Sequence, residues 1–443
     1  MKKTKNEIFD TIIIGGGIAG LTVANELKNS NILLLEKEQV CGGRTLSYKF
    51  GDYIFNSGAQ VILGKATIEL AKKLNVKLTL IDKKLIPICF NNKLIKAQTQ
   101  IGFLLSLPLN LQDKIKLAKM ILQMRFRYGN WFNKKLDIFD PKLNILFNKT
   151  LEDLFGSFSS MPLKNFWDSL AKGSNTVKSN ESAVFQIIDT FLCFAHKEYF
   201  VEGGTGKLTK ALWDQVKQKT IISAEVFKII QNKNNVEISF NCNGLQKIVR
   251  TKRCVLAIPA PIILSITNNL PLSKKKVLSQ FIFGSYTVAG FLLNKKTSYY
   301  LDKGMWRIPV VGNANIISIT DPTFTYSEDY KTKSGQGLLR IYTGNESSKR
   351  LQELTDKEAL SILTKELVSI FPNIEKHIIK TSLKHWIHAI YFIKPGDLEY
   401  MQQVKIPVSR IHFCGDYTIY AGLEAAIASG YRVAKELLTN RET

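Results

Sequence analysis

The stretch "FDTIIIGGGIAGLTVANEL" near the start of the chain constrains the fold more than any other part of the sequence. Ile12–Ile14 is an aliphatic run of the kind that forms a strand buried on both faces of a parallel sheet. Gly15, Gly17 and Gly20 follow it at the spacing GxGxxG, and apolar residues then recur at helical spacing. In such a unit the first glycine permits the turn, the second lets a pyrophosphate approach the backbone, and the third lets helix and strand pack closely. The stretch therefore predicts a dinucleotide whose phosphates lie at a helix N-terminus.

A second apolar segment, "NILLLEKE", supports this prediction because it leads into Glu36. This acid lies 21 residues after Gly15, where a carboxylate accepts hydrogen bonds from both hydroxyls of a ribose. The same carboxylate repels a 2′-phosphate, so a ligand of the NADP type is disfavoured. The alternative is a fortuitous glycine turn before an unrelated helix, and the second strand with its acid argues against it.

Neither a secretory signal nor a membrane span is predicted. Glu7 and Asp10 interrupt the basic start, and the apolar run Thr11–Ile14 is shorter than the roughly 7 to 15 residues of a signal's hydrophobic region. The longest later apolar run, "IGFLLSLPLNL", contains Pro108 and is well short of the roughly 20 residues that span a bilayer. The six cysteines are far apart and form no CxxC pair, so we expect a reducing compartment, the cytoplasm.

The chain is strongly basic, with 61 Lys and Arg against 37 Asp and Glu and a net charge of +24. Such a balance suits an anionic partner, but Lys and Asn are abundant throughout, which favours a solvated surface over a dedicated patch. The basic and aromatic stretch "RFRYGNWFNKK" is predicted to be the solvated end of a helix. Peripheral membrane contact beside "IGFLLSLPLNL" is left open, and nucleic-acid binding is not predicted.

Directly after Glu36, the segment "KEQVCGGRTLSYKFGDYIFNSGAQVI" resembles the FAD-dependent amine oxidase superfamily. This group includes monoamine and polyamine oxidases, protoporphyrinogen oxidases, carotenoid desaturases and renalase-like proteins. Gly42, Gly43 and Arg44 match its GGR turn. "RIHFCGDYTIYAGLEAAIASGYRVAKEL" resembles its closing motif, and "TIISAEVFKIIQNKNNVEISF" resembles the strand that offers a valine backbone to the adenine. The three segments occur in the family's order and reach both ends and the middle of the chain.

The resemblance implies an FAD-dependent oxidoreductase that transfers hydride from a substrate C–H bond to flavin N5. Arg44 would lie near the phosphates, Asp416 near the ribityl and pyrophosphate region, and the first turn of the last helix near flavin N1 and O2. The cofactor-binding residues implied in this way are Gly15, Gly17, Ile18, Ala19, Gly20, Glu36, Lys37, Gly43, Arg44, Gly58, Ala59, Gln60, Val226, Gly415, Asp416, Leu423 and Ala425. No catalytic acid or base is assigned.

Departures from the amine oxidase pattern bear on the substrate. Val288 stands where many members carry a lysine near N5, and Gly422 stands where they carry an aromatic residue. "KHWIHAIYFIKPG" is closer to the W-x-x-A-I-P pattern of protoporphyrinogen oxidases and desaturases, with Tyr391 in place of the proline. The comparison favours a large apolar substrate, with Trp386 and Tyr391 as substrate-site candidates, although Trp386 fits a core anchor equally well. An amine oxidase acting on a C–N bond, and a non-redox flavin protein such as an isomerase or a GDP-dissociation-inhibitor-like binder, are the alternatives.

The motifs predict an α/β fold in which a Rossmann-like FAD-binding domain is interleaved with an α+β substrate domain. The FAD-binding parts are expected at 1–85, 199–262 and 405–443. A helical insertion at 86–198 and a mixed sheet-and-helix region at 263–404 would form the substrate domain. The number of subunits is left open.

Two further patterns predict no site. "VEGGTGKL" resembles a phosphate-binding loop, but Val201 and Leu208 replace the glycine and the hydroxyl residue that such a loop requires, so Gly203 and Gly204 are expected to form a turn. His385 and His388 are three residues apart, yet no third ligand accompanies them in the sequence, so no metal site is predicted.

Overall fold

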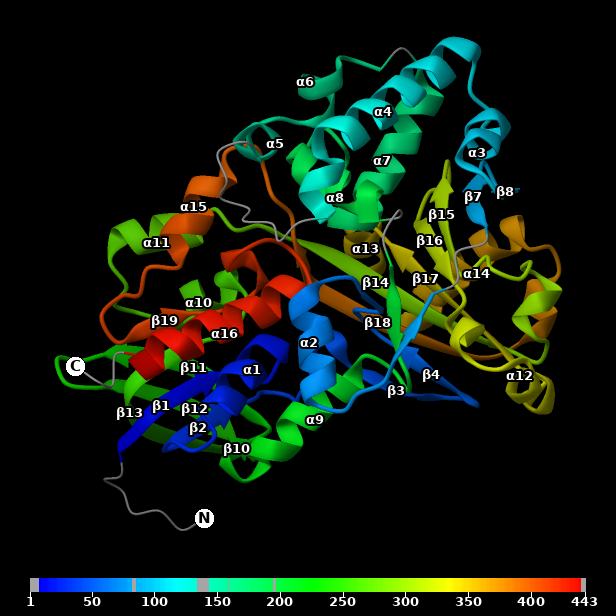
Figure 1. Cartoon of the computed structure of the whole chain (residues 1–443). Coiled ribbons are helices and arrows are strands. Elements are labelled where there is room, and N and C mark those ends of the chain that lie inside the picture. Colours follow the sequence, from blue (N-terminus) through cyan, green and yellow to red (C-terminus); the bar gives the residue numbers. More distant parts are fainter. Residues whose placement is uncertain (1–7, 82–84, 134–142, 159, 194–196, 440–443) are drawn as a thin grey trace.

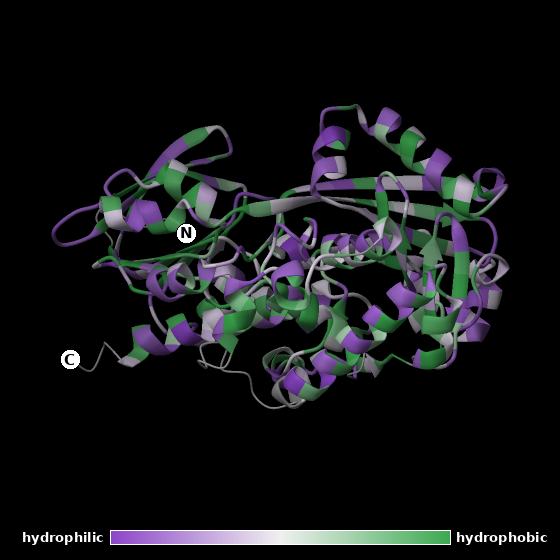
Figure 2. Ribbon diagram, turned by 90° about the horizontal axis from the view of Figure 1, so that it is seen from above, coloured by the Kyte–Doolittle hydropathy of each residue, from purple (hydrophilic) through white to green (hydrophobic). Residues whose placement is uncertain are grey.

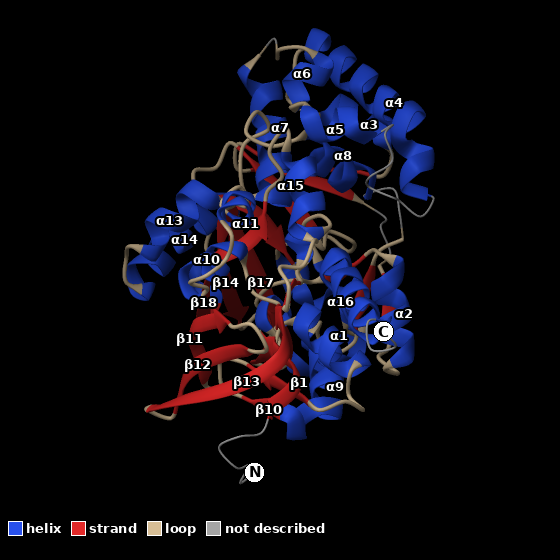
Figure 3. Ribbon diagram, turned by 90° about the vertical axis from the view of Figure 1, so that its left-hand side faces the viewer, coloured by secondary structure: helices blue, strands red, loops and turns tan. Residues whose placement is uncertain are grey.

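The computed structural model describes residues 8–81, 85–133, 143–158, 160–193 and 197–439 (Figure 1). Two seven-stranded sheets organise the described chain. One end of the molecule carries the first sheet, and the other end carries a group of helices, with the second sheet between them (Figure 3). This is the mixed α/β architecture that the motifs predict.

The first sheet takes its strands from three separate parts of the chain. Its order is β10-β2-β1-β13-β12-β11, and β19 pairs with β13. The strands are β1 (Ile8–Ile14), β2 (Ile32–Leu35), β10 (Thr220–Ile221), β11 (Ala224–Gln231), β12 (Val236–Cys242), β13 (Leu245–Leu256) and β19 (Ile411–Phe413). Pairing is parallel among β10, β2, β1, β13 and β19, and antiparallel from β11 to β13.

The centre of this sheet is buried on both faces, as the run Ile12–Ile14 predicts. Ile13 packs toward α1 (Ile18–Glu26), α9 (Gly206–Val216) and α16 (Leu423–Thr439). Ile12 and Ile14 pack into the core on the other face, which includes side chains of α10 (Ala260–Ile266), α11 (Leu272–Leu278) and α15 (Asp397–Val404). Successive strand residues point to opposite faces, so a continuous aliphatic run satisfies both layers.

The second sheet has the order β18-β14-β17-β16-β15-β7-β8. Its strands are β7 (Ile86–Phe90), β8 (Lys93–Ala97), β14 (Phe283–Leu293), β15 (Arg307–Val311), β16 (Ile316–Thr320), β17 (Gly337–Thr343) and β18 (Ile378–Tyr391). Alternate aliphatic residues on one face, such as Leu339 and Ile341, form a core with side chains of α14 (Asp356–Ile370). The helix α13 (Asn345–Gln352) contacts β14 and β18. The residues between these aliphatic positions are therefore presented to the other face.

A helical layer stands at the end of the molecule away from the first sheet (Figures 1 and 3). It consists of α3 (Gln100–Ser106), α4 (Leu111–Asn133), α5 (Asn144–Asn148), α6 (Leu151–Phe155), α7 (Met161–Asn175) and α8 (Val184–Cys193). Strands are mainly hydrophobic, whereas the outer helices mix hydrophobic and hydrophilic residues (Figure 2). Among the described residues, none of the helices combines the length and the apolar composition needed to cross a bilayer.

Smaller elements complete the fold. They are the hairpin β3 (Ser47–Phe50) and β4 (Tyr53–Asn56), the sheet of β5 (Val61–Ile62), β9 (Tyr199–Val201) and β6 (Leu78–Leu80), and the helices α2 (Lys65–Lys73) and α12 (Glu328–Ser334). Gly203 and Gly204 form the predicted turn between β9 and α9, with φ of 78° and 93°. The domain boundaries stay a prediction.

Candidate functional site

The glycine turn after β1 requires its glycines for different steric reasons. Gly15 has a φ of 104°, and a Cβ there would lie 2.6 Å from the carbonyl oxygen of Ala257. A Cβ at Gly20 would collide with the Gly15 carbonyl oxygen, so α1 can approach β1 closely only with glycine. At Gly17, by contrast, no atom of the described chain beyond the adjacent residues lies within 4 Å of an added Cβ. The N-terminus of α1 thus opens onto free space.

The GGR turn lies directly beside this first turn. The Gly42 N–H donates to the Gly16 carbonyl oxygen over 2.8 Å, and Gly17 and Gly42 form a parallel bridge. A Cβ at Gly43 would lie 3.4 Å from the Cα of Gly17. Two backbone turns that are distant in sequence therefore form one narrow cradle around the start of α1.

Glu36 is buried at the edge of the cradle, with 7% of the residue exposed. Its carboxylate accepts the Gly16 N–H over 2.6 Å and the Glu38 N–H over 2.9 Å. Burial raises the pKa of Glu36 above its ordinary value, although both backbone donors oppose that shift. The Ala224 N–H donates to the Glu36 carbonyl oxygen, which brings the start of β11, and half-buried Val226 on that strand, to this edge. Lys37 is exposed, 3.6 Å from the carboxylate of Glu38.

Arg44 and Asp416 form an ion pair between the two ends of the chain. The guanidinium donates to the two carboxylate oxygens of Asp416 over 3.0 and 3.1 Å, and to the Ala389 carbonyl oxygen over 2.9 Å. Asp416 is buried, and Gly415 before it is held by a hydrogen bond from its N–H to the Ser429 hydroxyl, 3.0 Å. A bidentate pair of this kind fixes the guanidinium plane.

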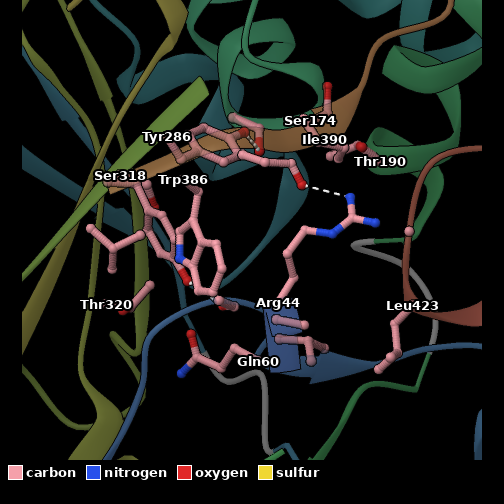
Figure 4. A pocket seen from close by; sticks show the side chains of 18 of the residues that line it. Arg44, Gln60, Ser174, Thr190, Tyr286, Ser318, Thr320, Trp386, Ile390 and Leu423 are labelled. Carbon is pink, nitrogen blue, oxygen red and sulfur yellow. Dashed lines mark hydrogen bonds between the residues drawn. The ribbon is translucent and has the colours of Figure 1, made fainter. Parts of the chain in front are cut away.

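A cavity of about 320 Å³ lies at this ion pair (Figure 4). Eight of the residues predicted from the motifs line it: Ile18, Arg44, Gly58, Ala59, Gln60, Trp386, Asp416 and Leu423. The Ala59 N–H donates to the Arg44 carbonyl oxygen over 2.8 Å, so the Gly58–Gln60 segment is fixed to the GGR turn. The buried amide nitrogen of Gln60 has no hydrogen-bond partner among the described residues.

The two substrate-site candidates differ in their placement. Trp386 lines the cavity, and its indole N–H donates to the Ser57 carbonyl oxygen over 2.6 Å. Tyr391 is fully buried and is not among the cavity-lining residues, and its hydroxyl donates to Asp397 over 2.9 Å. Its ring packs against Phe281. Tyr391 therefore occupies a core position in this structure.

The remaining predicted positions lie around the cradle or at the start of α16. Ala425 is buried in the first turn of α16, and Gly422 before it lines the cavity with a φ of 132°. The carboxylate of Glu424 turns away to α2, where it accepts the N–H groups of Ala66 and Thr67 over 2.6 and 2.9 Å.

The second sheet supplies cavity residues that the motifs did not indicate. They include Tyr286, Arg307, Ser318, Thr320 and Tyr342, together with Val288, which the motif comparison had marked only as the replacement of a lysine. Behind them Arg340 is fully buried and donates to Thr320 Oγ1 over 3.1 Å and to the Asn56 carbonyl oxygen over 2.7 Å. Alternation in "LLRIYTG" indicates only that Arg340 and Tyr342 share the face opposite the core that contains Leu339 and Ile341.

A second cavity, of about 350 Å³, adjoins the first. The two share Leu170, Arg307 and Pro309 in their walls. The Arg307 guanidinium donates to the buried carboxylate of Glu198 over 2.9 Å. The rest of the second wall is largely apolar and comes from β7, α3, α4 and α7.

The cradle fits a dinucleotide. Among the described residues no side chain caps the N-terminus of α1, and the first turn of the helix contains no acidic residue, so its backbone N–H groups suit an anion. The space at Gly17, the buried carboxylate of Glu36 and the unpartnered amide of Gln60 are features that such a ligand would complete.

The two histidines do not converge on a common site. They lie three residues apart on β18 and have different neighbours. His385 contacts the Thr287 hydroxyl over 2.8 Å, and His388 packs against Phe283. Within the described ranges, no group of three or more His, Cys, Asp or Glu residues could hold a metal ion.

Comparison with known proteins gives one consistent family. Residues 18–438 match the family model described as flavin containing amine oxidoreductase. An L-amino-acid oxidase of Demansia vestigiata is 22% identical over 99% of this chain and 88% of that protein. The cyclohexylamine oxidase of Brevibacterium oxydans superposes with a TM-score of 0.77 at 17% identity, over 99% of this chain and all of that one. A protein from Exiguobacterium provisionally named protoporphyrinogen oxidase gives a TM-score of 0.76 at 15% identity, over 98% and 99% of the two chains.

Proposed function

The chain belongs to the flavin-containing amine oxidoreductase family, and from this premise we propose which of its residues hold the FAD and what class of substrate it oxidises. It is an FAD-dependent oxidoreductase. One observation supports the site assignment above all others. The GGR turn, the closing motif and the segment Gly58–Gln60 surround a single cavity, and the Arg44–Asp416 pair joins two of them.

In the proposed site the N-terminus of α1, with Gly15, Gly17, Ile18, Ala19 and Gly20, holds the pyrophosphate of FAD. Glu36 accepts the hydroxyls of the adenosine ribose, with Lys37 beside it, and the backbone of Val226 meets the adenine. The residues proposed for the flavin half and the phosphates next to it are Gly43, Arg44, Gly58, Ala59, Gln60, Gly415, Asp416, Leu423 and Ala425. When bound, FAD supplies the acceptor for a hydride from a substrate C–H bond.

The chain's own residues position the substrate and exclude water, and none acts as a base. The titratable groups that line the cavity are Arg44, Asp416, Arg307, Tyr286 and Tyr342. Arg44 and Asp416 neutralise each other, and Arg307 is paired with Glu198. Burial raises the pKa of both tyrosines, so they stay protonated at neutral pH. This lining is consistent with a direct hydride transfer that needs no protein base.

We propose that the substrate is a bulky and mainly apolar organic molecule. Val288 and Gly422 at the cavity replace the lysine and the aromatic residue expected for simple amines, and the adjoining second cavity provides further apolar space. Oxidation of a C–N bond is the second candidate, because relatives and structural neighbours include an L-amino-acid oxidase and a cyclohexylamine oxidase. A non-redox flavin protein is the third, and nothing in the cavity specifically favours it.

An anaerobic spectrum separates these candidates. Purified protein is expected to be yellow, and a substrate is expected to bleach the flavin absorbance. Amines, polyenes and porphyrinogens would be added in parallel under argon. Bleaching by amines alone would contradict the apolar proposal, and turnover without any bleaching would indicate a non-redox protein. A protein that stays colourless after FAD is added would contradict FAD binding itself.

We also propose that the protein works in the cytoplasm, contacts a membrane peripherally and binds no nucleic acid. The five cysteines whose side chains are described are free and buried, which suits a reducing compartment. Part of the basic stretch "RFRYGNWFNKK", from residue 134 on, lies outside the described residues. Its described start belongs to α4, an exposed helix of the helical layer.

A further inference from the structure

Helix α4 carries two apolar faces, of which only one is covered by the part of the chain that the structure describes. The buried side chains are Leu117, Met120, Met124 and Tyr128. A second set of apolar side chains is exposed: Leu111 (73%), Ile115 (47%), Leu122 (53%) and Phe126 (82%). At 3.6 residues per turn the two sets lie on opposite sides of the helix. An ordinary surface helix would have polar residues at the second set of positions.

The exposed face continues onto the neighbouring helix. Ile101 and Leu105 on α3, four residues apart, are 73% and 65% exposed. α3 and α4 contact each other and are joined by a short connection. Single exposed apolar residues are normal on a protein surface, whereas a run of them along two adjoining helices marks a contact surface.

The charges around this face indicate what covers it. Between residues 111 and 129 there are five cations: Lys114, Lys116, Lys119, Arg125 and Arg127. The single carboxylate in that range, Asp113, is buried and bonded to the Ser160 hydroxyl. Lys119 and Arg127 fall on one side of the apolar stripe. Lys114 and Arg125 lie on the other side, where they donate to the Leu105 carbonyl oxygen and the Gln100 side chain of α3 over 2.6 and 2.9 Å. Apolar side chains flanked by cations suit an interface with acyl chains below and anionic headgroups around it.

We propose that α3 and the first five turns of α4 form a docking face for the surface of an anionic lipid bilayer. Ile101, Leu105, Leu111, Ile115, Leu122 and Phe126 enter the headgroup–acyl boundary. The flanking lysines and arginines contact lipid phosphates.

The second cavity lies behind the same helices. Phe103 and Leu104 of α3 and Leu117 and Ile121 of α4 contribute to its wall. It adjoins the first cavity, so an apolar molecule that leaves the bilayer would have apolar space next to the proposed flavin site. This consequence, unlike the docking face itself, rests on the proposed function.

Vesicle flotation of the full-length, flavin-loaded protein tests the docking face. We expect the protein to float with vesicles of phosphatidylcholine containing about one third phosphatidylglycerol, and much less with phosphatidylcholine alone or at 0.5 M salt. The double variant Leu122→Ser/Phe126→Ser is expected to lower the bound fraction about five-fold or more. A matched control, Leu272→Ser/Ile379→Ser, removes apolar side chains that are 84% and 52% exposed elsewhere and is expected to bind like the wild type.

A second measurement keeps the test decisive if the double variant folds poorly. In Phe126→Trp, lipids brominated on the acyl chains should quench the new indole, whereas in Leu272→Trp they should not. Equal quenching in both variants, absence of flotation by the wild type, or equal binding of the double variant and its control would overturn the proposal. The proposal would also be overturned if sedimentation velocity showed a wild-type dimer that becomes monomeric in the double variant. The exposed face would then join two copies of the chain. The flavin spectrum is recorded in each sample, so a failure of docking is distinguished from a failure of FAD binding.

Discussion

The protonation of the Glu36 side chain is expected to depend on whether FAD occupies the proposed site. In the protein alone its buried carboxylate has two backbone donors and a pKa raised by burial. An ionised buried carboxylate is costly unless further donors reach it. Two ribose hydroxyls would be such donors, so the interaction of this residue with FAD depends on its protonation state.

We expect Glu36→Ala to release FAD, because two hydrogen bonds to a charged acceptor are lost. At about 1.5 to 3 kcal/mol each, the loss corresponds to a weakening of FAD affinity by at least about a hundred-fold. Flavin occupancy after gel filtration and titration of the apoprotein measure it. Glu38→Ala, which removes an exposed carboxylate two residues away, is the control and should keep wild-type occupancy. Full occupancy in Glu36→Ala would contradict the assignment of this residue.

The raised pKa of Glu36 also predicts that the stability of the apoprotein and its affinity for FAD change in opposite directions with pH. A raised pKa in the folded state means that apoprotein stability from this group is present at low pH and is lost as the pH rises through that pKa. The proposed contact with FAD needs the carboxylate form of Glu36, so the affinity for FAD should fall as the pH is lowered toward the same pKa. Titrations of wild type and Glu36→Gln between pH 5 and 8 check this, and the variant should give a flatter profile. Parallel profiles would show that another group is responsible.

Helix α2 is capped by a residue from a distant element. Its N-cap, Gly64, provides no side-chain hydrogen bond, and a side chain there would collide with Glu424. Glu424 at the start of α16 instead accepts two backbone N–H groups and the Thr67 hydroxyl of α2. Glu424 thereby stabilises the positive end of α2 and fixes the first turn of α16 against it.

Glu424→Ala is expected to destabilise the protein by about 2 kcal/mol, since it removes a cap bonded to three donors. Thermal unfolding of the apoprotein measures the change without a contribution from FAD. Glu328→Ala, which removes an exposed acid from the first turn of α12, is expected to cost much less. Similar losses for the two variants would mean that the contact between α2 and α16 contributes little.

The first sheet takes its strands from three separate segments of the chain, so we expect FAD binding to stabilise the molecule as a whole. We expect FAD at about 100 times its dissociation constant to raise the stability of the apoprotein by about 2.7 kcal/mol and to shift one common transition by a few degrees. Differential scanning calorimetry tests this. A shift confined to one of two separate transitions would indicate that the substrate domain unfolds independently of the FAD site.

The family, the fold class and FAD as cofactor were predictable from the sequence and are confirmed. They were predictable because backbone turns such as Gly15–Gly20 and Gly42–Arg44 tolerate few other residues, which leaves a readable pattern. Arg340 and Tyr342 left no such pattern, since strand alternation shows which face a residue occupies but not which other strand it meets. Tyr391 is the opposite case: the sequence pattern marked it as a candidate substrate residue, but its side chain lies in the core. The individual FAD contacts and the domain boundaries stay predictions.

The strand β19 and the helix α16 are the last elements of the chain, yet β19 pairs with β13, and α16 packs on α1 near the first glycine turn. During synthesis, everything up to about residue 405 therefore leaves the ribosome before β19, a partner of β13, and α16, which packs on α1, exist. The nascent chain has to tolerate an open sheet edge and an uncovered aliphatic surface on α1 for that time. Chaperone dependence and the timing of flavin incorporation should thus be governed by the emergence of β19 and α16 and not by emergence of the N-terminal motif.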